Sequence, residues 1–210
     1  MSDFDTGIQD ASQQNSNLYH RVRWTSEKIG QRLRLVERLV YRAREALPPF
    51  QYLRLPGPRV DPPLTPGRDP AWQSIPWGSY WGEPDADFVL HTRFQVPARW
   101  SNDAPVALHL PLGTAGDFSH PEALAYIDGA PYAACDRHHQ EIILDPEYRQ
   151  GNVHSLALHG WTGSMEGGQG PCLWMQECAL VQIDQPCRDL LAAARVALGV
   201  ADALGKDDPI

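Results

Sequence analysis

Long apolar runs are missing from this sequence. No stretch approaches the roughly 20 consecutive apolar residues that a membrane-spanning helix needs. The N-terminal segment MSDFDTGIQDASQQNSN is polar and acidic, whereas a secretory signal peptide begins with basic residues and continues with an apolar segment. We therefore expect a protein that stays in the cytoplasm and has no membrane partner.

Several signatures of catalytic and nucleotide-binding sites are also absent. The sequence contains no G-x-S-x-G elbow, no His-x-Asp pair, no phosphate-binding loop and no dinucleotide fingerprint. Its four cysteines include no C-x-x-C pair. Because the cytoplasm is reducing, we interpret these cysteines as free thiols, most of them buried.

An excess of positive charge is lacking as well. The net charge of −8 argues against a nucleic-acid partner, because phosphate binding needs clustered Lys and Arg. Residues 19–46 are the exception, with eight basic and three acidic residues. An RNA-binding arm would suit this charge, but the apolar stripe within the segment favours a solvated or interdomain helix.

Composition favours β-structure for the body of the chain. The 210 residues include 19 prolines and 17 glycines, which suit short strands joined by turns better than a helical bundle. A hydrophobic fraction of 42% is enough for one sizeable core. We expect a mainly β domain with an added helical layer.

The order of segments predicts five regions. Residues 1–18 show no periodicity and are expected to be disordered. An amphipathic basic helix is predicted over residues 19–47, because apolar residues recur there at spacings of three and four. A proline-rich connector over residues 48–70 lies over a surface, a β-sandwich of jelly-roll type occupies residues 71–184, and a C-terminal helix covers residues 185–204. Asp128-Gly129 predicts a two-residue hairpin inside the sandwich.

The stretch PYAACDRHHQEIILDP, residues 131–146, holds the densest group of polar side chains. We interpret residues 136–144 as a strand, in which successive side chains point to opposite faces. One face then carries Cys135, Arg137, His139 and Glu141, and the other carries Asp136, His138 and Gln140. The adjacent histidines point apart, which disfavours a metal site built from both. A polar network against another domain, a contact to sugar hydroxyls and the hydrogen-bonded edge of a sandwich remain open.

Aromatic residues form a second candidate site within the segment AWQSIPWGSYWGEP, residues 71–84. Trp77, Tyr80 and Trp81 could stack against a pyranose ring, as aromatic side chains on sugar-binding surfaces do. The alternative is that they pack beneath the proline-rich connector. The sequence alone leaves both interpretations open.

Three motifs follow one another between the two predicted helices. A W-G pair precedes an aromatic strand that ends in V-P, a Y-x-D-G hairpin comes next, and D-R-x-H-x-E follows it. The matching positions are Trp81, Gly82, Val96, Pro97, Tyr126, Asp128, Gly129, Asp136, Arg137, His139 and Glu141.

This order resembles the N-terminal region of cytosolic or vacuolar-type α-mannosidases of glycoside hydrolase family 38, over about residues 20–204. The resemblance implies a galactose-binding-like jelly roll flanked by an N-terminal and a C-terminal helix. It also implies that zinc or another divalent metal, and all catalytic residues, belong to a (β/α) barrel that follows this region in the family. The loop between Leu112 and Ala123 departs from the family, because it is longer than the tight turn found there.

The resemblance therefore implies a non-catalytic accessory domain that supports an α-mannosidase barrel and is inactive by itself. In this interpretation Asp136, Arg137, His139 and Glu141 face the catalytic domain or an α-mannoside held between the domains. The helices leave apolar stripes uncovered, so a homo-oligomer is a further expectation. Two alternatives remain: a free-standing carbohydrate-binding module, and a small metal-dependent enzyme around residues 135–141.

Overall fold

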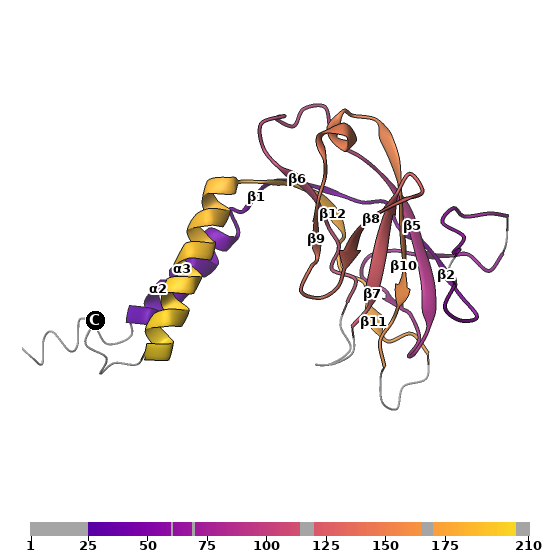
Figure 1. Cartoon of the computed structure of the whole chain (residues 1–210), viewed down its shortest axis with the longest axis horizontal. Coiled ribbons are helices and arrows are strands. Elements are labelled where there is room, and N and C mark those ends of the chain that lie inside the picture. Colours follow the sequence, from indigo (N-terminus) through magenta and orange to yellow (C-terminus); the bar gives the residue numbers. More distant parts are fainter. Residues whose placement is uncertain (1–24, 60, 69, 114–119, 165–169, 205–210) are drawn as a thin grey trace, which may run out of the picture. The chain divides into compact units, whose positions relative to one another are not determined.

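The computed structural model of the chain describes residues 25–59, 61–68, 70–113, 120–164 and 170–204 (Figure 1). The chain divides into two units, one formed by Tyr41–Asp184 and the other by the segments on either side of it. The predicted disorder of residues 1–18 lies outside the described residues.

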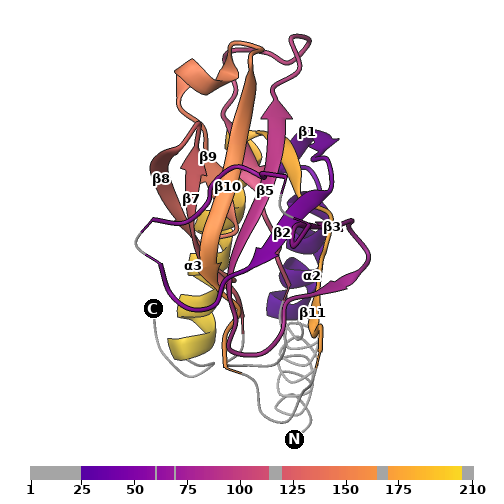
Figure 2. The same cartoon turned by 90° about the vertical axis from the view of Figure 1, so that its right-hand side faces the viewer.

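The unit Tyr41–Asp184 is a β-sandwich in which all neighbouring strands are antiparallel. Figure 2 shows the larger sheet from its outer side. Its strand order is β3 (Gln73–Ile75), β2 (Phe50–Arg54), β5 (Asp87–Gln95), β10 (Val153–Trp161), β7 (Glu122–Ile127) and β8 (Ala130–Cys135). The smaller sheet has the order β1 (Tyr41–Ala46), β12 (Ala179–Ile183), β6 (Val106–His109) and β9 (Glu141–Ile143). A separate ribbon pairs β4 (Tyr80–Trp81) with β11 (Leu173–Trp174), and a 3-10 turn, η1, covers Pro146–Arg149.

The chain crosses repeatedly between the two sheets, as in a jelly roll. From β5 it passes to β6, returns for the hairpin β7–β8, passes to β9, and returns again for β10. Alternate residues of the facing strands form the core, among them Phe88, Leu108, Ile127 and Leu158, each at most 1% exposed. The predicted mainly β jelly-roll sandwich with two helices is confirmed.

The predicted helix over residues 19–47 is too long at its C-terminal end. Helix α2 spans Thr25–Glu37, and the segment Tyr41–Ala46 is strand β1, paired with β12. The apolar spacing of a helix continues through Ala43, but the backbone gains a ladder of hydrogen bonds along β12 instead. Pairing with a distant strand has overridden the local pattern.

The predicted connector over residues 48–70 begins with a strand. Phe50 and Tyr52 of β2 point into the core while Gln51 points away from it, which is the alternation of a strand. The prolines at 48 and 49 precede the strand, where a missing N–H is tolerated. The chain after Arg54 then crosses the outer side of the larger sheet, as both views show (Figure 1, Figure 2).

The predicted hairpin at Asp128-Gly129 is confirmed. It joins β7 to β8 with φ angles of 51° and 84°, the two positive values that a type I′ turn requires. The Asp128 carboxylate holds this turn to β10, because Oδ1 accepts a hydrogen bond from the N–H of Ser155 at 2.8 Å and Oδ2 lies 2.7 Å from Nδ1 of His154. Burial raises the pKa of Asp128, but the interactions with His154 and Ser155 together lower it more, so the pKa is lowered overall.

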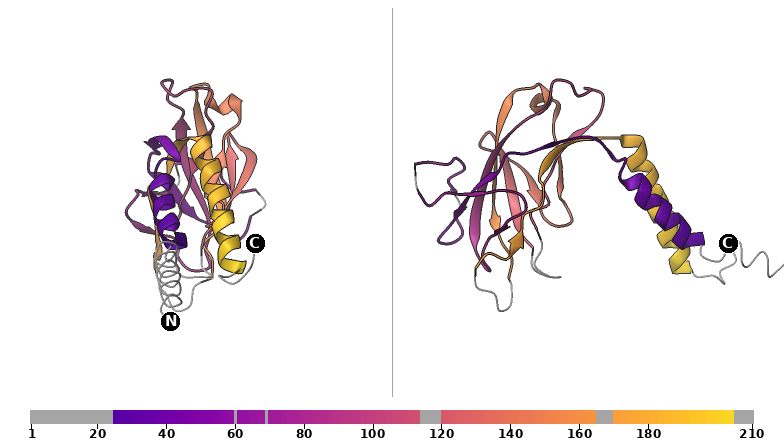
Figure 3. Two further views of the ribbon diagram at one scale, coloured as in Figure 1. Left: turned by 90° about the vertical axis from the view of Figure 1, so that its left-hand side faces the viewer. Right: turned by 180° about the vertical axis from the view of Figure 1, so that it is seen from behind.

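The second unit is a pair of helices. Helix α3 spans Gln185–Leu204, as predicted, and runs beside α2 in the opposite direction (Figure 3). Nη2 of Arg195 on α3 lies 2.6 Å from Oε1 of Glu37 at the end of α2. No helix in the described part of the chain is long and apolar enough to cross a membrane.

A matched pair of glycine substitutions tests the packing of the central strands. A Cβ at Gly160 of β10 would lie 2.1 Å from the backbone oxygen of Glu122 and 2.8 Å from Cα of Ala123. We expect Gly160→Ala to lower the free energy of unfolding by about 1–3 kcal/mol, because two backbones must move apart. A Cβ at Gly57 would meet no atom within 4 Å, so Gly57→Ala should change the free energy of unfolding by less than about 0.5 kcal/mol. Urea unfolding followed by tryptophan fluorescence measures both, and equal midpoints would contradict the packing described.

Candidate functional site

The polar stretch predicted as a strand over residues 136–144 is a turn followed by a short strand. Strand β8 ends at Cys135 and β9 begins only at Glu141. Between them the backbones of Asp136 and His139 bond to each other, with N···O distances of 3.2 and 3.4 Å. The assignment of residues 136–140 to alternating strand faces is therefore wrong. We call residues 136–140 the Asp136 turn.

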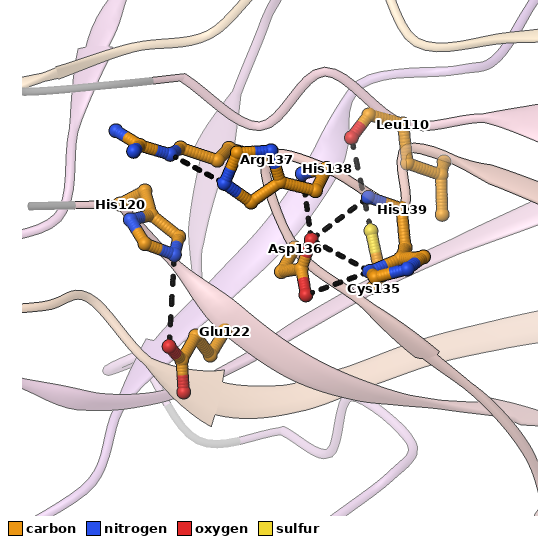
Figure 4. Close-up of polar contacts among 8 residues, drawn as sticks. All are labelled: Leu110, His120, Glu122, Cys135, Asp136, Arg137, His138 and His139. Carbon is orange, nitrogen blue, oxygen red and sulfur yellow. Dashed lines mark hydrogen bonds and ion pairs between the residues drawn. The ribbon is translucent and has the colours of Figure 1, made fainter. Parts of the chain in front are cut away.

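The carboxylate of Asp136 organises this turn (Figure 4). Its Oδ1 accepts hydrogen bonds from the backbone N–H groups of His138 at 2.6 Å and His139 at 2.8 Å. The ring Nδ1 of His139 lies 3.0 Å from Oδ2. Aspartate competes with regular structure in this way, because its short side chain can bond to the N–H groups that a strand would use. This competition is the physical reason why the strand does not form.

These contacts stabilise the ionised form of Asp136. The hydrogen bond with the His139 ring is the largest cause, and the two backbone N–H groups add to it against a smaller effect of burial. Together they lower the pKa of Asp136 from 3.8 to about 2. A permanently ionised carboxylate suits a structural or binding role and does not suit a general acid.

The side chains of Arg137 and His138 lie on the side of the turn that faces His120 (Figure 4). Nε of Arg137 donates a hydrogen bond to Nε2 of His138 at 3.1 Å. The ring of His138 lies 6.3 Å from that of His120, and Nε2 of His120 lies 3.6 Å from Oε1 of Glu122 (Figure 4). The turn thus presents guanidinium, imidazole and carboxylate groups close together on the surface of the sandwich.

Glu141 joins this group from the first position of β9. It lies opposite His109 of β6 and accepts a hydrogen bond from the hydroxyl of Tyr41. An open hollow of about 360 Å³ lies here, lined by Tyr41, His109, Arg137, His138, His139, Gln140 and Glu141. The structure therefore brings Arg137, His139 and Glu141 to one hollow, although through a turn and not through strand alternation. Asp136 supports the hollow without lining it.

Tyr41 and His109 are site residues that the sequence reasoning missed. Their rings pack 5.5 Å apart, and the pKa of His109 is lowered chiefly by burial and further by the charge of Arg44. The buried Nδ1 of His109 has no hydrogen-bond partner among the described residues. No local motif marks either residue, because they reach the hollow through the arrangement of β1, β6 and β9.

Cys135 does not take part in chemistry at this site. Its sulfur is buried and lies 3.8 Å from the carbonyl oxygen of Leu110, and burial raises the pKa of the thiol to about 12. A thiol that stays protonated is a poor metal ligand and a poor nucleophile. Within the described ranges, no group of three His, Cys, Asp or Glu residues is arranged to hold a metal ion. The alternative of a metal-dependent enzyme around residues 135–141 therefore has no support in the geometry.

The three predicted stacking residues separate into two groups. Trp81 is 1% exposed, packs edge-to-face on Phe88 at 5.1 Å, and donates from Nε1 to the carbonyl of Leu112 at 2.9 Å. It is a core residue, so its assignment as a stacking residue is wrong. Trp77 and Tyr80 are 63% and 60% exposed.

The exposed aromatic residues lie around the ribbon of β4 and β11. Trp174 of β11, which the sequence reasoning missed, is paired with Tyr80 of β4 and is 45% exposed. The two rings meet edge-to-face with centroids 4.9 Å apart. The turn that carries Trp77 is held by a 2.8 Å hydrogen bond from Gly78 N–H to the carbonyl of Met175, the residue that follows β11. We call Trp77, Tyr80 and Trp174 the aromatic ribbon.

Comparison with known proteins gives a partial likeness in structure. No protein-family model matches the sequence, and no curated protein matches it. The apo structure of β-glucuronidase from Ruminococcus gnavus and its complex with D-glucuronic acid each align with a TM-score of 0.45 and 14% identity. The complex of the same enzyme with a C6-substituted uronic isofagomine aligns with a TM-score of 0.44 and 14% identity. These alignments cover 68% of this chain and 29–30% of the enzyme, so the chain spans less than a third of its length.

Replacing one histidine tests the electrostatics of the Asp136 turn. His139→Ala removes the largest cause of the lowered pKa, so the pKa of Asp136 should rise from about 2 toward 3.8. Carboxyl NMR titration measures this value directly. The folded pKa is the depressed one, so the stability from this carboxylate is complete above pH 3.8 and is lost as the pH falls toward 2. His138→Ala keeps the backbone N–H that binds Asp136 and should move the pKa much less; equal shifts in the two variants would contradict this assignment.

Proposed function

We propose that this chain is the N-terminal accessory, non-catalytic region of a family 38 α-mannosidase, and that the parent enzyme hydrolyses α-D-mannosides. The order of motifs supports this proposal, and the jelly-roll sandwich with a helix on each side in the sequence agrees with it. The observation that carries it is the Asp136 turn, in which the residues of the D-R-x-H-x-E motif build one organised polar surface beside a hollow.

The polar groups at the hollow suit contact with hydroxyl-rich or polar surfaces. Arg137 supplies N–H donors, Glu141 supplies acceptor oxygens, and His139 can supply either, which is the mixture that sugar hydroxyls or a polar domain interface requires. The turn is held by several hydrogen bonds of Asp136, so little further ordering is needed on binding. The site therefore suits support of a partner domain and of an α-mannoside placed between the two.

Asp136 is unsuited to act as the acid of glycoside hydrolysis at this site. Glycoside hydrolysis requires a carboxylic acid with a raised pKa beside a second carboxylate. Asp136 has a lowered pKa, and Asp128 is held by His154 and Ser155 at the far end of the hairpin. Zinc or another divalent metal would belong to the catalytic barrel that the resemblance implies.

To test this proposal, the chain is expressed together with the family 38 catalytic barrel encoded in the same genome, either fused in one polypeptide or as two separate polypeptides. The barrel should bind the chain and hydrolyse a chromogenic α-mannoside, and it should be less active or less stable without the chain. The double variant Arg137→Ala, Glu141→Ala should lower kcat/KM or the binding constant about tenfold, a loss of about 1.4 kcal/mol.

Arg99→Ala provides the control for that experiment. Arg99 is an exposed residue of the sandwich that pairs with Glu45 and does not line the hollow, so its loss should change neither quantity. A genome without such a barrel, or a barrel that neither binds the chain nor depends on it, overturns the proposal. Full activity in the double variant refutes the role of the Asp136 turn.

The aromatic ribbon favours a second candidate function, carbohydrate binding by the chain itself. Its three rings are exposed although apolar, and the edge-to-face contact of Tyr80 with Trp174 holds two of them in place. Aromatic rings held in this way present flat apolar faces, which match the C–H face of a pyranose, and polar tips that remain in water.

Titration with methyl α-mannoside and short α-mannosides tests the ribbon. We expect saturable binding with a Kd in the millimolar range, about −4 kcal/mol, because only a few rings contribute. Trp174→Ala should abolish it, whereas Trp161→Ala should not, since Trp161 is exposed at the end of β10 outside the ribbon. Binding that survives Trp174→Ala, or no binding at any concentration reached, rejects this candidate.

A further inference from the structure

Helix α3 is apolar around most of its circumference. Its 20 residues include four charged ones, Arg188, Asp189, Arg195 and Asp202. Leu191 is buried, and Ala194 and Leu198 are half-buried, which marks the side that packs on α2. Four large apolar residues of the helix are nevertheless exposed by 42% or more: Leu190, Val196, Val200 and Leu204. Contiguous exposed apolar surface of this kind marks an interaction site, so we expect a further element to cover this side of α3.

The exposed side has a regular spacing. Leu190, Ala193, Ala197, Ala201 and Leu204 follow one another at intervals of three, four, four and three residues, so they form one stripe along the helix. All five are exposed, Leu190 by 56% and Leu204 by 42%, and Val196 and Val200 widen the stripe at its edge. We call these five residues the α3 stripe.

The sequence of the α3 stripe is symmetric about Ala197. Seven residues before and seven residues after Ala197 stands a leucine, and four residues before and after it stands an alanine. A contact between two identical helices about a two-fold axis needs this symmetry, because each residue before the axis meets the corresponding residue after it. The α3 stripe is therefore complementary to a second copy of itself in the antiparallel orientation.

We propose that two copies of this chain associate through α3, with the helices antiparallel and Ala197 on the two-fold axis. Leu190 of one copy then packs on Leu204 of the other, and Ala193 packs on Ala201. Small residues at the centre let the helix axes approach closely, while the leucines fill the space at both ends. The antiparallel arrangement also places the positive end of each helix dipole beside the negative end of the other.

Charge and size both favour α3 over α2 as the contact. The exposed residues of α2 include Lys28, Arg32, Arg34, Glu27 and Glu37, so two copies meeting through α2 would have to bury charged side chains. The α3 stripe contains no charged residue. A 20-residue helix is about 30 Å long, and pairing two of them buries on the order of 1,000 Å², the lower limit for a specific interface.

Sedimentation and light scattering of the full chain over a range of concentrations test this proposal. We expect a particle of twice the chain mass of 23.4 kDa. Ala197→Glu places two carboxylates face to face on the axis and should weaken association at least 100-fold. Ala192→Glu adds the same charge to the same helix, on an exposed position away from the stripe, and should leave the dimer intact.

Cross-linking is a second test, which does not depend on whether Ala197→Glu unfolds the helix. Ala197→Cys should form a disulfide-linked dimer under mild oxidation, and Ala192→Cys should not. A chain that is monomeric at every concentration, a dimer equally sensitive to both glutamates, or equal cross-linking at both positions overturns the proposal. The proposal does not rest on the proposed function, because each readout measures only association of the chain with itself.

Discussion

The pairing of β1 with β12 is the contact on which most of this architecture depends. Tyr41–Ala46 and Ala179–Ile183 lie more than 130 residues apart in the sequence, yet they form neighbouring antiparallel strands of the smaller sheet. Helix α2 ends at Glu37, just before β1, and α3 begins at Gln185, just after β12. Antiparallel pairing of the two strands therefore brings the two helices side by side and orients them in opposite directions. The same pairing gives the smaller sheet its fourth strand.

Local signals in the sequence predicted those parts of the fold that local interactions determine. The hairpin at Asp128-Gly129 needs only two residues that tolerate positive φ, and the bounds of α3 follow from its continuous apolar spacing. Strand β1 could not be predicted in this way, because its apolar residues keep a helical spacing and its strand partner lies at the other end of the domain. Strand β2 was obscured by the prolines beside it, although the alternation of Phe50 and Tyr52 with Gln51 was a usable signal.

The candidate site shows the same division. The sequence identified Arg137, His139 and Glu141 correctly as neighbours, but for the wrong geometric reason. Strand alternation failed because Asp136 binds the backbone N–H groups of His138 and His139, which a strand would have used in its own ladder. Tyr41 and His109 could not be predicted as site residues from the sequence, because only the arrangement of β1, β6 and β9 brings them to the hollow. The different roles of Tyr80 and Trp81 follow from the alternation of side chains along β4, where Tyr80 points to solvent and Trp81 points to the core.

The electrostatics of the Asp136 turn explain why its residues suit binding better than catalysis. A catalytic acid must hold a proton near neutral pH, and this requires an environment that destabilises the carboxylate. The turn does the opposite, because two N–H groups and an imidazole all favour the charged form of Asp136. The carboxylate therefore keeps its charge and its hydrogen bonds throughout the physiological pH range, and the backbone of His138 and His139 stays in one conformation. A surface whose polar groups are already fixed loses little entropy when a partner binds, so its conformational order itself contributes to affinity.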